Sequence, residues 1–462
     1  MIEGADEPSP ALPFGYAPML LVSFLCGMAI TFNRGAYSDG ALALVLIALG
    51  VLVFSVIESS RRRVSIERNP RMLLVLVWLG LVAMAFYAWN DEIIIYPVQP
   101  WEAGRKAQIA ALFLLATYAP FLTGKWREPK AVRLARFAGF AVVVAVAGAD
   151  VIKASPAPRI DVWTVQQDGA AALKAWRNPY TAVAERDTGP RAADDVPYVY
   201  PPTQLYLTLP AYVLAKDVRF TMLTAILLAG FGMRYIAARA RTGLPSIAED
   251  APTLYVWLMT KTFLILEQSW VDPVQVMLIT MVCCAYVARL PLLTAVLLGV
   301  VLSAKQTMFW AVGLTGVILR FDRKQWVTTA CVGAALVLPF ALIDFRALKH
   351  ANFDFLSHLP ARPDALTFNT WFLRKFGSEL PGALGFVLAA IVAGASMWWM
   401  KRSVARLTVA LAATYAVFFA FNKWAFANYY FLMAGLASLA AAAACHTAGA
   451  GVSLAGSEIE PG

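Results

Sequence analysis

Long apolar runs separated by short polar connections make up most of the chain. The runs are roughly 15 to 20 residues long, a length that matches helices crossing a hydrocarbon core about 30 Å thick. Several are short enough to tilt little, merge or re-enter, so the pattern predicts an all-α polytopic membrane protein with about 12 to 14 transmembrane helices. The runs fall at about 17–33, 41–57, 72–89, 107–123, 137–152, 219–237, 252–267, 273–288, 291–304, 306–320, 327–343, 383–400, 405–421 and 428–445.

A long polar stretch, 153–218, interrupts this pattern. Its segment DVWTVQQDGAAALKAW is rich in helix formers, opens on Asp161 as an N-cap and is followed by Asn178-Pro179, where a helix is expected to stop. The polar RDTGPRAADD is expected to be irregular, and TQLYLTLPAYVLA, with Pro210 inside it, is too short to span comfortably. The sequence therefore predicts a large loop that carries a short helix, followed by an interfacial or re-entrant segment.

The composition supports a membrane protein. Of 462 residues, 60% are hydrophobic and 15% charged, which is more apolar than one soluble core of this length requires. All five cysteines fall inside apolar runs, where they are expected to pack rather than to form disulfides or a zinc site. We expect one membrane domain, with an amino-terminal set of four helices in 1–136, a larger helical region in 137–445 and a polar tail in 446–462.

The formal charge of +10 is distributed as membrane topology requires, which argues against a nucleic-acid partner. Connections rich in Lys and Arg alternate with poorer ones, and we assign the rich side to the cytoplasm together with both termini. The loops 153–218 and 344–382 then face outward. The acidic, Pro-rich start is expected to precede a retained anchor rather than to be a cleaved signal, which is compatible with a bacterial inner membrane. The basic connections are RRRVSIERNPR, GKWREPKAVRLAR, RYIAARARTG, ARL, RFDRKQW and KRSVAR.

Two carboxylates in the first outer loop are candidates for chemistry. Asp161 comes soon after the fifth apolar run ends, and Asp168 follows two helical turns later on about the same face. One carboxylate could act as a general base on a substrate hydroxyl, or the pair could hold a divalent cation. The alternative is that Asp161 caps the helix and Asp168 lies on a solvated surface.

Two short connections assigned to the same side carry further polar residues. Lys305 lies between two apolar runs, where its ammonium could neutralise a phosphate at the lipid surface or snorkel to the interface. In the acidic connection EQSWVDP, Glu267, Gln268 and Asp272 could line the same cleft or cap two helices.

Lys261 lies inside an apolar run, where an ionisable residue needs an explanation. It could bind a lipid phosphate, or it could pair with an acid at a helix end, such as Asp344.

The second outer loop is basic and aromatic. His350 and His358 lack the ordered spacing of a metal site. They are expected either to be solvated or to bind the acceptor. Asn369 and Arg374 stand in TFNTWFLRKFG, a stretch suited to sugar stacking, to anionic lipid or to interface anchoring.

The sequence contains no G-x-x-x-x-G-K-[ST] loop, no G-x-G-x-x-G turn and no G-x-S-x-G elbow, which argues against a soluble nucleotide-binding engine in these residues. A lipid-linked donor is the expected source of activated substrate on the outer side. No cofactor is expected, and a divalent cation at Asp168 stays an open alternative.

The order of these motifs resembles the GT-C superfamily of integral-membrane glycosyltransferases, most closely the glycosyltransferase family 87 type that uses polyprenyl-phosphate mannose. The family's G-Q before a helix appears here as Glu267-Gln268 and its K-P as Lys305-Gln306, and the four helices before residue 137 are additional to its simplest pattern. The resemblance covers roughly residues 137 to 445 and rests on short motifs, namely Asp161 before a short helix, Asn178-Pro179-Tyr180, Tyr200-Pro201-Pro202, Glu267-Gln268 and Ala304-Lys305.

The resemblance implies a GT-C-like bundle that transfers a sugar, mannose first, from a polyprenyl-phosphate donor to a glycolipid or glycan acceptor, with inversion. Asp161 is then the expected base, and Lys305, Lys261 and Arg374 are expected to bind the donor phosphate. The expected substrate-binding residues are Asp168, Tyr180, Tyr198, Tyr200, Glu267, Gln268, Asp272, His350, His358 and Asn369.

Two rival interpretations stay open. A multi-pass transporter or lipid flippase would suit many helices and the intramembrane Lys261. A non-catalytic subunit of a polysaccharide-assembly complex could keep the fold and lose the base.

Overall fold

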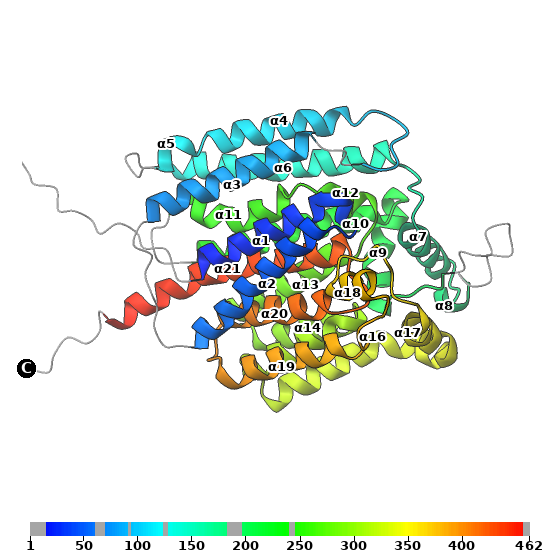
Figure 1. Ribbon diagram of the computed structural model, residues 1–462. Helices are drawn as coiled ribbons and strands as arrows, with labels where there is room; N and C mark the ends of the chain where they lie inside the picture. Colours follow the sequence, from blue (N-terminus) through cyan, green and yellow to red (C-terminus); the bar gives the residue numbers. More distant parts are fainter. Residues whose placement is uncertain are drawn as a thin grey trace, which may run out of the picture.

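The computed structural model describes residues 15–60, 70–90, 94–122, 128–182, 196–239 and 245–455, and every regular element in these ranges is a helix (Figure 1). The amino-terminal helices are α1 (Tyr16–Thr31), α2 (Asp39–Ser60), α3 (Pro70–Asn90), α4 (Glu102–Ala116), α5 (Ala119–Leu122) and α6 (Lys130–Ala154), with a short 3₁₀ turn, η1 (Phe32–Gly35), after α1. The first long polar stretch and the segment after it form α7 (Asp161–Lys174), α8 (Pro179–Ala182) and α9 (Pro202–Ala215).

The remaining helices follow with short connections. They are α10 (Arg219–Ala238), α11 (Ser246–Trp257), α12 (Thr262–Glu267), α13 (Asp272–Val287), α14 (Pro291–Leu302), η4 (Gln306–Met308), α15 (Phe309–Ile318) and α16 (Arg323–Lys349). A π-helical turn, η5 (His350–Asp354), leads into α17 (Phe355–His358), α18 (Phe368–Phe376), α19 (Leu384–Trp399), α20 (Val404–Ala420) and α21 (Ala427–Ala455).

Each predicted apolar run falls mainly on helices, and the run 252–267 is interrupted between α11 and α12. Among the described residues, six spans are long and apolar enough to cross a membrane, and they are Tyr16–Gly35, Asp39–Ser59, Lys130–Ala154, Arg219–Ala238, Arg323–His358 and Ala427–His446. Shorter apolar helices make up the rest of the bundle. The prediction of an all-helical protein with membrane-spanning helices is confirmed for the described residues, while the number of crossings stays a prediction.

Large apolar side chains cover much of the outer surface of the bundle. Leu342 on α16 is 77% exposed, and Phe54 on α2, Met72 on α3 and Ile391 on α19 are each more than half exposed. A soluble protein rarely exposes so much contiguous apolar surface, so these faces suit lipid chains.

α21 is the central helix of the bundle, with α1 and α20 packed along it (Figure 1). Small residues let these helices approach closely: Gly435 leaves no room for a Cβ beside Val276 of α13, and the hydroxyl groups of Ser438 and Ser23 lie 2.9 Å apart. α1 packs against α21, and α2 packs against α20. The predicted boundary at residue 136 stays a prediction.

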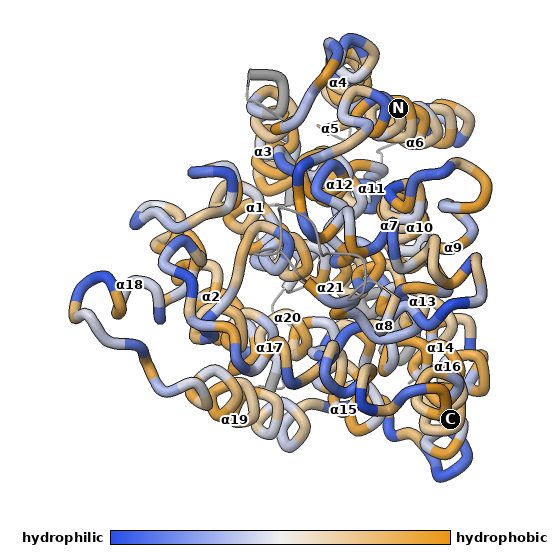
Figure 2. Tube along the Cα trace, turned by 90° about the vertical axis from the view of Figure 1, so that its right-hand side faces the viewer, coloured by the Kyte–Doolittle hydropathy of each residue, from blue (hydrophilic) through white to orange (hydrophobic). Residues whose placement is uncertain are grey.

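The connections assigned to the outer side meet at one end of the bundle, which we call the loop end. α7, α8, α17 and α18 lie there (Figure 1), and Figure 2 looks onto it and shows hydrophilic segments in the connections around α7, α8 and α9. Backbone hydrogen bonds join these connections pairwise, from Tyr37 N to Asp364 O, Val98 N to Ala154 O, Thr203 N to Ser303 O and Leu366 N to Ala425 O. The grouping of connections into one side is thus confirmed, and its orientation in the cell stays a prediction.

Charged side chains hold the opposite end together. Arg234 of α10 donates to Glu249 and contacts Asp250 of α11, both at 2.7 Å, and Arg133 of α6 pairs with the same Glu249. The Tyr118 hydroxyl donates to Asp250 at 2.6 Å. Each buried charge in this group has an opposite partner, which offsets the cost of its burial.

Candidate functional site

The predicted short helix after α6 is α7, and Asp161 is its first residue. The Asp161 Oδ1 atom accepts a hydrogen bond from Val162 N at 2.8 Å, and the side chain is exposed. The predicted N-cap role of Asp161 is wrong, because Ile160 is the N-cap of α7 and no side chain caps the helix; Asp161 is an acidic residue in the first turn, where a negative charge is favourable, and it faces solvent. The helix ends at Lys174, a few residues before Asn178-Pro179, because the chain leaves the helix through Trp176 at φ +58°.

The segment 198–201, which we call the strap, has no regular secondary structure and leads into α9. Gln306 Nε2 donates to Val199 O at 2.6 Å and to Asn352 Oδ1 at 3.2 Å, so it ties the strap to η4 and η5. The Tyr180 hydroxyl donates to Tyr200 O at 2.9 Å. These bonds fix Tyr200 over the end of the bundle, immediately before Pro201-Pro202 starts α9.

A buried ion pair lies under the strap. Lys305 Nζ donates to Asp272 Oδ1 at 2.8 Å, and Asn428 Nδ2 donates to Asp272 Oδ2 at 2.7 Å. The ammonium also lies 4.7 Å from the ring centroid of Tyr429. Asp272 and Lys305 come from different connections and are both buried, so they meet only because α13, α14 and α21 end at the same place.

Tyr200 lies within electrostatic reach of Asp161, Asp272 and Tyr429. Burial raises the pKa of the Tyr200 phenol well above its ordinary value, and Tyr429, Asp161 and Asp272 raise it further, so these groups lie within electrostatic reach of it. Tyr200 and Tyr429 both keep part of their surface accessible, whereas Asp272 and Lys305 are buried. The name Tyr200 cluster is used here for Asp161, Tyr200, Asp272, Lys305, Asn428 and Tyr429.

Arg362 brings a second cation to the rim of the cluster. Its guanidinium bonds both oxygens of Asp364, at 3.0 and 2.7 Å, and lies 4.7 Å from the ring centroid of Phe426, two residues before Asn428. The hydrogen bond to Asp364 raises the Arg362 pKa, and Asp161 contributes to the same shift. The Arg362 side chain is 54% exposed, so its ion pair is open to water and is weak.

Two predicted tyrosines lie behind the strap. Tyr198 is fully buried, with its ring centroid 5.6 Å from Tyr180 and 5.9 Å from Tyr200, and Tyr180 packs edge-on against Phe340 of α16. Gly169 of α7 leaves no room for a Cβ beside the Tyr198 ring. Tyr198 and Tyr180 thus pack against Tyr200 and hold it in place. A direct contact of Tyr198 or Tyr180 with substrate stays a prediction.

Glu267 is engaged with the backbone. Its carboxylate accepts hydrogen bonds from Ile95 N and Tyr96 N, both at 2.8 Å, and from Gln268 Nε2 at 3.0 Å. The side chain is fully buried. These hydrogen bonds hold the connection between α3 and α4 against the end of α12. Glu267, which replaces the glycine of the G-Q pattern, therefore has a structural role.

The helix of residues 246–267 is broken, which the sequence did not predict. α11 ends at Trp257, α12 begins at Thr262, and Lys261 is fully buried at the break. The Thr262 hydroxyl donates to Val256 O at 2.7 Å, a carbonyl near the end of α11, and the Thr260 hydroxyl donates to Gly27 O of α1 at 3.3 Å. Asp344 Oδ1 accepts a hydrogen bond from Ala347 N at 2.9 Å, where α16 is kinked, and the pairing of Asp344 with Lys261 stays a prediction.

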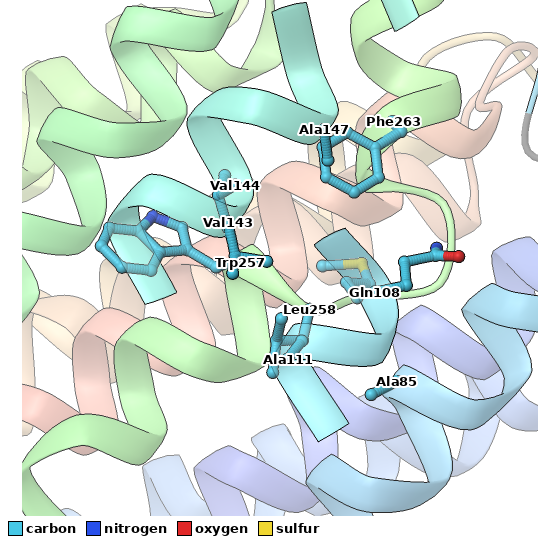
Figure 3. A pocket seen from close by; sticks show the side chains of 10 residues that line it. Ala85, Gln108, Ala111, Val143, Val144, Ala147, Trp257, Leu258 and Phe263 are labelled. Carbon is cyan, nitrogen blue, oxygen red and sulfur yellow. The ribbon is translucent and has the colours of Figure 1, made fainter. Parts of the chain in front are cut away.

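A small cavity lies beside this break, between it and α3, α4 and α6. Figure 3 shows it lined by Trp257, Leu258, Phe263 and other apolar side chains, with the Gln108 amide at its rim. Its volume of about 20 Å³ holds roughly one water molecule, which is far too little for a sugar or a lipid head group.

The remaining predicted residues lie on the second loop or on α7. His350 and His358 are exposed, and His358 Nδ1 lies 2.6 Å from Asp354 O. Asn369 is buried and accepts from Leu380 N at 2.7 Å. Arg374 Nε and Nη2 donate to Pro363 O at 3.0 and 2.7 Å. Arg374 therefore stabilises the backbone next to Arg362.

Asp168 is half-buried on α7, seven residues after Asp161. Within the described ranges no three His, Cys, Asp or Glu side chains gather as a metal ion would need. A divalent cation at Asp168 therefore stays an untested alternative.

Sequence reasoning missed three residues of this site: Arg362, Asn428 and Tyr429. Asn428-Tyr429 opens the last apolar run at its outer end, where a polar pair was available as a signal but was counted with the run. Arg362 stands in the second outer loop beside Asp364, and nothing in the local sequence distinguishes it from Arg374.

Compared with family models, with curated proteins and with solved structures, the chain matches none of them. The geometry of the Tyr200 cluster therefore carries the functional proposal.

Proposed function

We propose that this protein is a membrane glycosyltransferase that moves a sugar from a polyprenyl-phosphate donor to a glycolipid or glycan acceptor at the loop end. The observation that supports the proposal is that Asp161 and the buried Lys305–Asp272 pair both lie within electrostatic reach of Tyr200, while the exposed Arg362 lies within electrostatic reach of Asp161. A carboxylate and an available cation at one site are what the transfer needs, one for the acceptor proton and one for the leaving phosphate.

The proposed reaction is a single in-line displacement. Asp161 takes the proton of the acceptor hydroxyl, whose oxygen forms a bond to the anomeric carbon. The bond between that carbon and the phosphate oxygen breaks, and its electron pair leaves with the polyprenyl phosphate, which inverts the configuration. Arg362 can exchange its exposed Asp364 partner for the phosphate, and Lys305 lies buried beyond it.

The fold supports a finer topology as part of the proposal. With an even number of crossings, about 12 to 14, both termini lie in the cytoplasm and the loop end faces the periplasm of a bacterial inner membrane. The polyprenyl chain would then lie along the apolar outer faces of the bundle while its phosphate reaches the loop end. Mannose remains the first sugar to try.

A transporter or flippase is the second candidate, because the break between α11 and α12 with Lys261 buried in it is a feature of transport sites. The cavity at the break, with room for about one water molecule, supports this candidate poorly.

The two candidates differ in a direct experiment. Purified protein is incubated with radiolabelled polyprenyl-phosphate sugars, mannose first, and with membrane lipids and glycans as acceptors. A glycosyltransferase yields labelled acceptor, whereas a flippase moves labelled donor across proteoliposomes without breaking its sugar–phosphate bond. Movement without transfer from any donor would contradict the proposal.

A further inference from the structure

Arg219, the first residue of α10, is fully buried, and each of its three guanidinium nitrogens makes at least one hydrogen bond. Its guanidinium pairs with Asp217, with Nη2 2.5 Å from Oδ2 and Nε 3.0 Å from Oδ1. Nη1 donates to Ser155 O at 2.7 Å and Nη2 to Ile152 O at 3.2 Å. Fully buried arginines are rare, and this one joins the end of α6 to the start of α10.

The same residue contacts the helix that carries the proposed base. The Arg219 guanidinium carbon lies 5.8 Å from the ring centroid of Trp163 on α7. One turn further, Gln167 Nε2 donates to Lys216 O at 3.0 Å and Gln167 Oε1 accepts from Val218 N at 2.9 Å. Gln166 Nε2 donates to Ser269 O at 2.6 Å.

These three side chains lie on one face of α7. Trp163, Gln166 and Gln167 are spaced at i, i+3 and i+4, so a single stripe of the helix is held against the bundle. Asp161 points from the opposite side of the helix, about 160° around the axis from Trp163 by helical geometry. The face that is held therefore sets where the Asp161 carboxylate points.

We propose that Arg219 is a positioning residue for Asp161. It fixes the last turn of α6, from which only six residues lead to Asp161, and it supports the first turn of α7 through Trp163. The inference rests on the proposed function, because Asp161 matters only if it acts as the base.

Arginine suits this place better than lysine. Its planar fork reaches the Asp217 carboxylate and two separate carbonyl oxygens at once, whereas a lysine ammonium is a single point with a different reach. Arg219→Lys thus keeps the charge and removes the geometry, which makes it the informative substitution.

The first test compares steady-state sugar transfer by the wild type, Arg219→Lys, Asp161→Asn and the double variant. We expect Arg219→Lys to lower kcat about 10- to 100-fold and to leave the KM for the donor unchanged within about twofold, since a small displacement of a catalytic group has effects of that size. In the Asp161→Asn background the same substitution should cause no further loss. Losses that multiply, or full activity in Arg219→Lys, would overturn the inference.

A matched control lies on the same helix. Arg234 binds two carboxylates at the other end of α10, about 22 Å away, so Arg234→Lys makes the same chemical change far from Asp161. It should reduce thermal stability without changing kcat in the folded fraction. Should Arg219→Lys fail to fold, Trp163→Leu replaces it, because it loosens α7 and leaves the Arg219–Asp217 pair intact.

The second test does not use activity. Spin labels on the exposed native Cys331 of α16 and on Trp176→Cys, at the 96% exposed end of α7, report the distance between α7 and the bundle in a Cys284→Ser background. Arg219→Lys should broaden this distance distribution and Arg234→Lys should not. An unchanged distribution overturns the positioning role, even if the wild type transfers no sugar. A broadened distribution in a protein that transfers no sugar would keep the role in holding α7 and would count only against the proposed function.

Discussion

The carboxylate of Asp272 accepts a hydrogen bond from the Lys305 ammonium at 2.8 Å, and both side chains are buried. Lys305 is therefore not a bare cation that waits for a phosphate. It is half of a neutral pair, with Asn428 completing the coordination of Asp272. The pair gives the site a fixed polar floor. The exposed Arg362 is the cation that can exchange Asp364 for another anion.

The buried pair makes a prediction about stability. Lys305→Met leaves the Asp272 carboxylate buried without its cation, so the free energy of unfolding should fall by about 3 to 5 kcal/mol. Asp272→Asn combined with Lys305→Met removes both charges and should recover part of that loss. Thermal unfolding in detergent measures both variants, and a single variant as stable as the wild type would show that the pair is not formed.

Arg362 should matter for the donor rather than for the fold. Arg362→Gln removes a charge-assisted contact worth about 1.5 to 3 kcal/mol, so the KM for the polyprenyl-phosphate donor should rise about 10- to 100-fold. Stability should change little, because the pair with Asp364 is exposed. Lys349→Gln, which breaks an exposed pair with Asp354 in the same loop, is the control and should leave the KM unchanged. Equal effects of the two substitutions would count against the role of Arg362.

Glu267 offers a choice between two roles. Its carboxylate is occupied by Ile95 N and Tyr96 N, so Glu267→Gln, which replaces one acceptor oxygen with a donor, should reduce stability by about 2 kcal/mol. The folded fraction should keep the kcat and KM of the wild type. Thermal unfolding and kinetics of the same preparation decide the matter, and a loss of activity without a loss of stability would return Glu267 to the substrate site.

Gly169 tests the support of Tyr200. A Cβ at this position would lie 2.6 Å from the Tyr198 ring, so Gly169→Ala should push α7 and the strap apart and lower kcat about tenfold. Gly394→Ala on α19 is the matched control, since no atom lies within 4 Å of its added Cβ, and it should stabilise the helix slightly. Activity assays on both variants measure the effect. An active Gly169→Ala protein would mean that the strap position is not critical.

The helices of this protein were predictable because their signal is local. The length of each apolar run can be read directly from the sequence. The uneven distribution of Lys and Arg groups the connections correctly, as the backbone hydrogen bonds from Tyr37 to Asp364 and from Thr203 to Ser303 show. The break at Leu258–Lys261 was not predictable in this way, because it sits inside a continuous apolar run and is stabilised by bonds to distant residues such as Gly27.

The candidate site was predictable only in part, for the same reason. Asp161, Tyr200, Asp272 and Lys305 could be named from their motifs, but the pairing of Asp272 with Lys305 depends on how α13 and α14 end against α21. Arg362 looks no different from Arg374 in sequence, although the Arg362 guanidinium pairs with Asp364 within electrostatic reach of Asp161 and the Arg374 guanidinium donates to Pro363 O. Tertiary packing separates their roles.

The central claim is that Asp161 takes the proton of the acceptor, and one measurement tests it most directly. Sugar transfer from a radiolabelled polyprenyl-phosphate donor is compared between the wild type, Asp161→Asn and the exposed control Asp354→Asn. The account predicts that Asp161→Asn lowers kcat by at least about 100-fold, in line with the loss of a general base, while the folded protein and the control keep their wild-type behaviour. An Asp161→Asn protein that transfers sugar as fast as the wild type would contradict it.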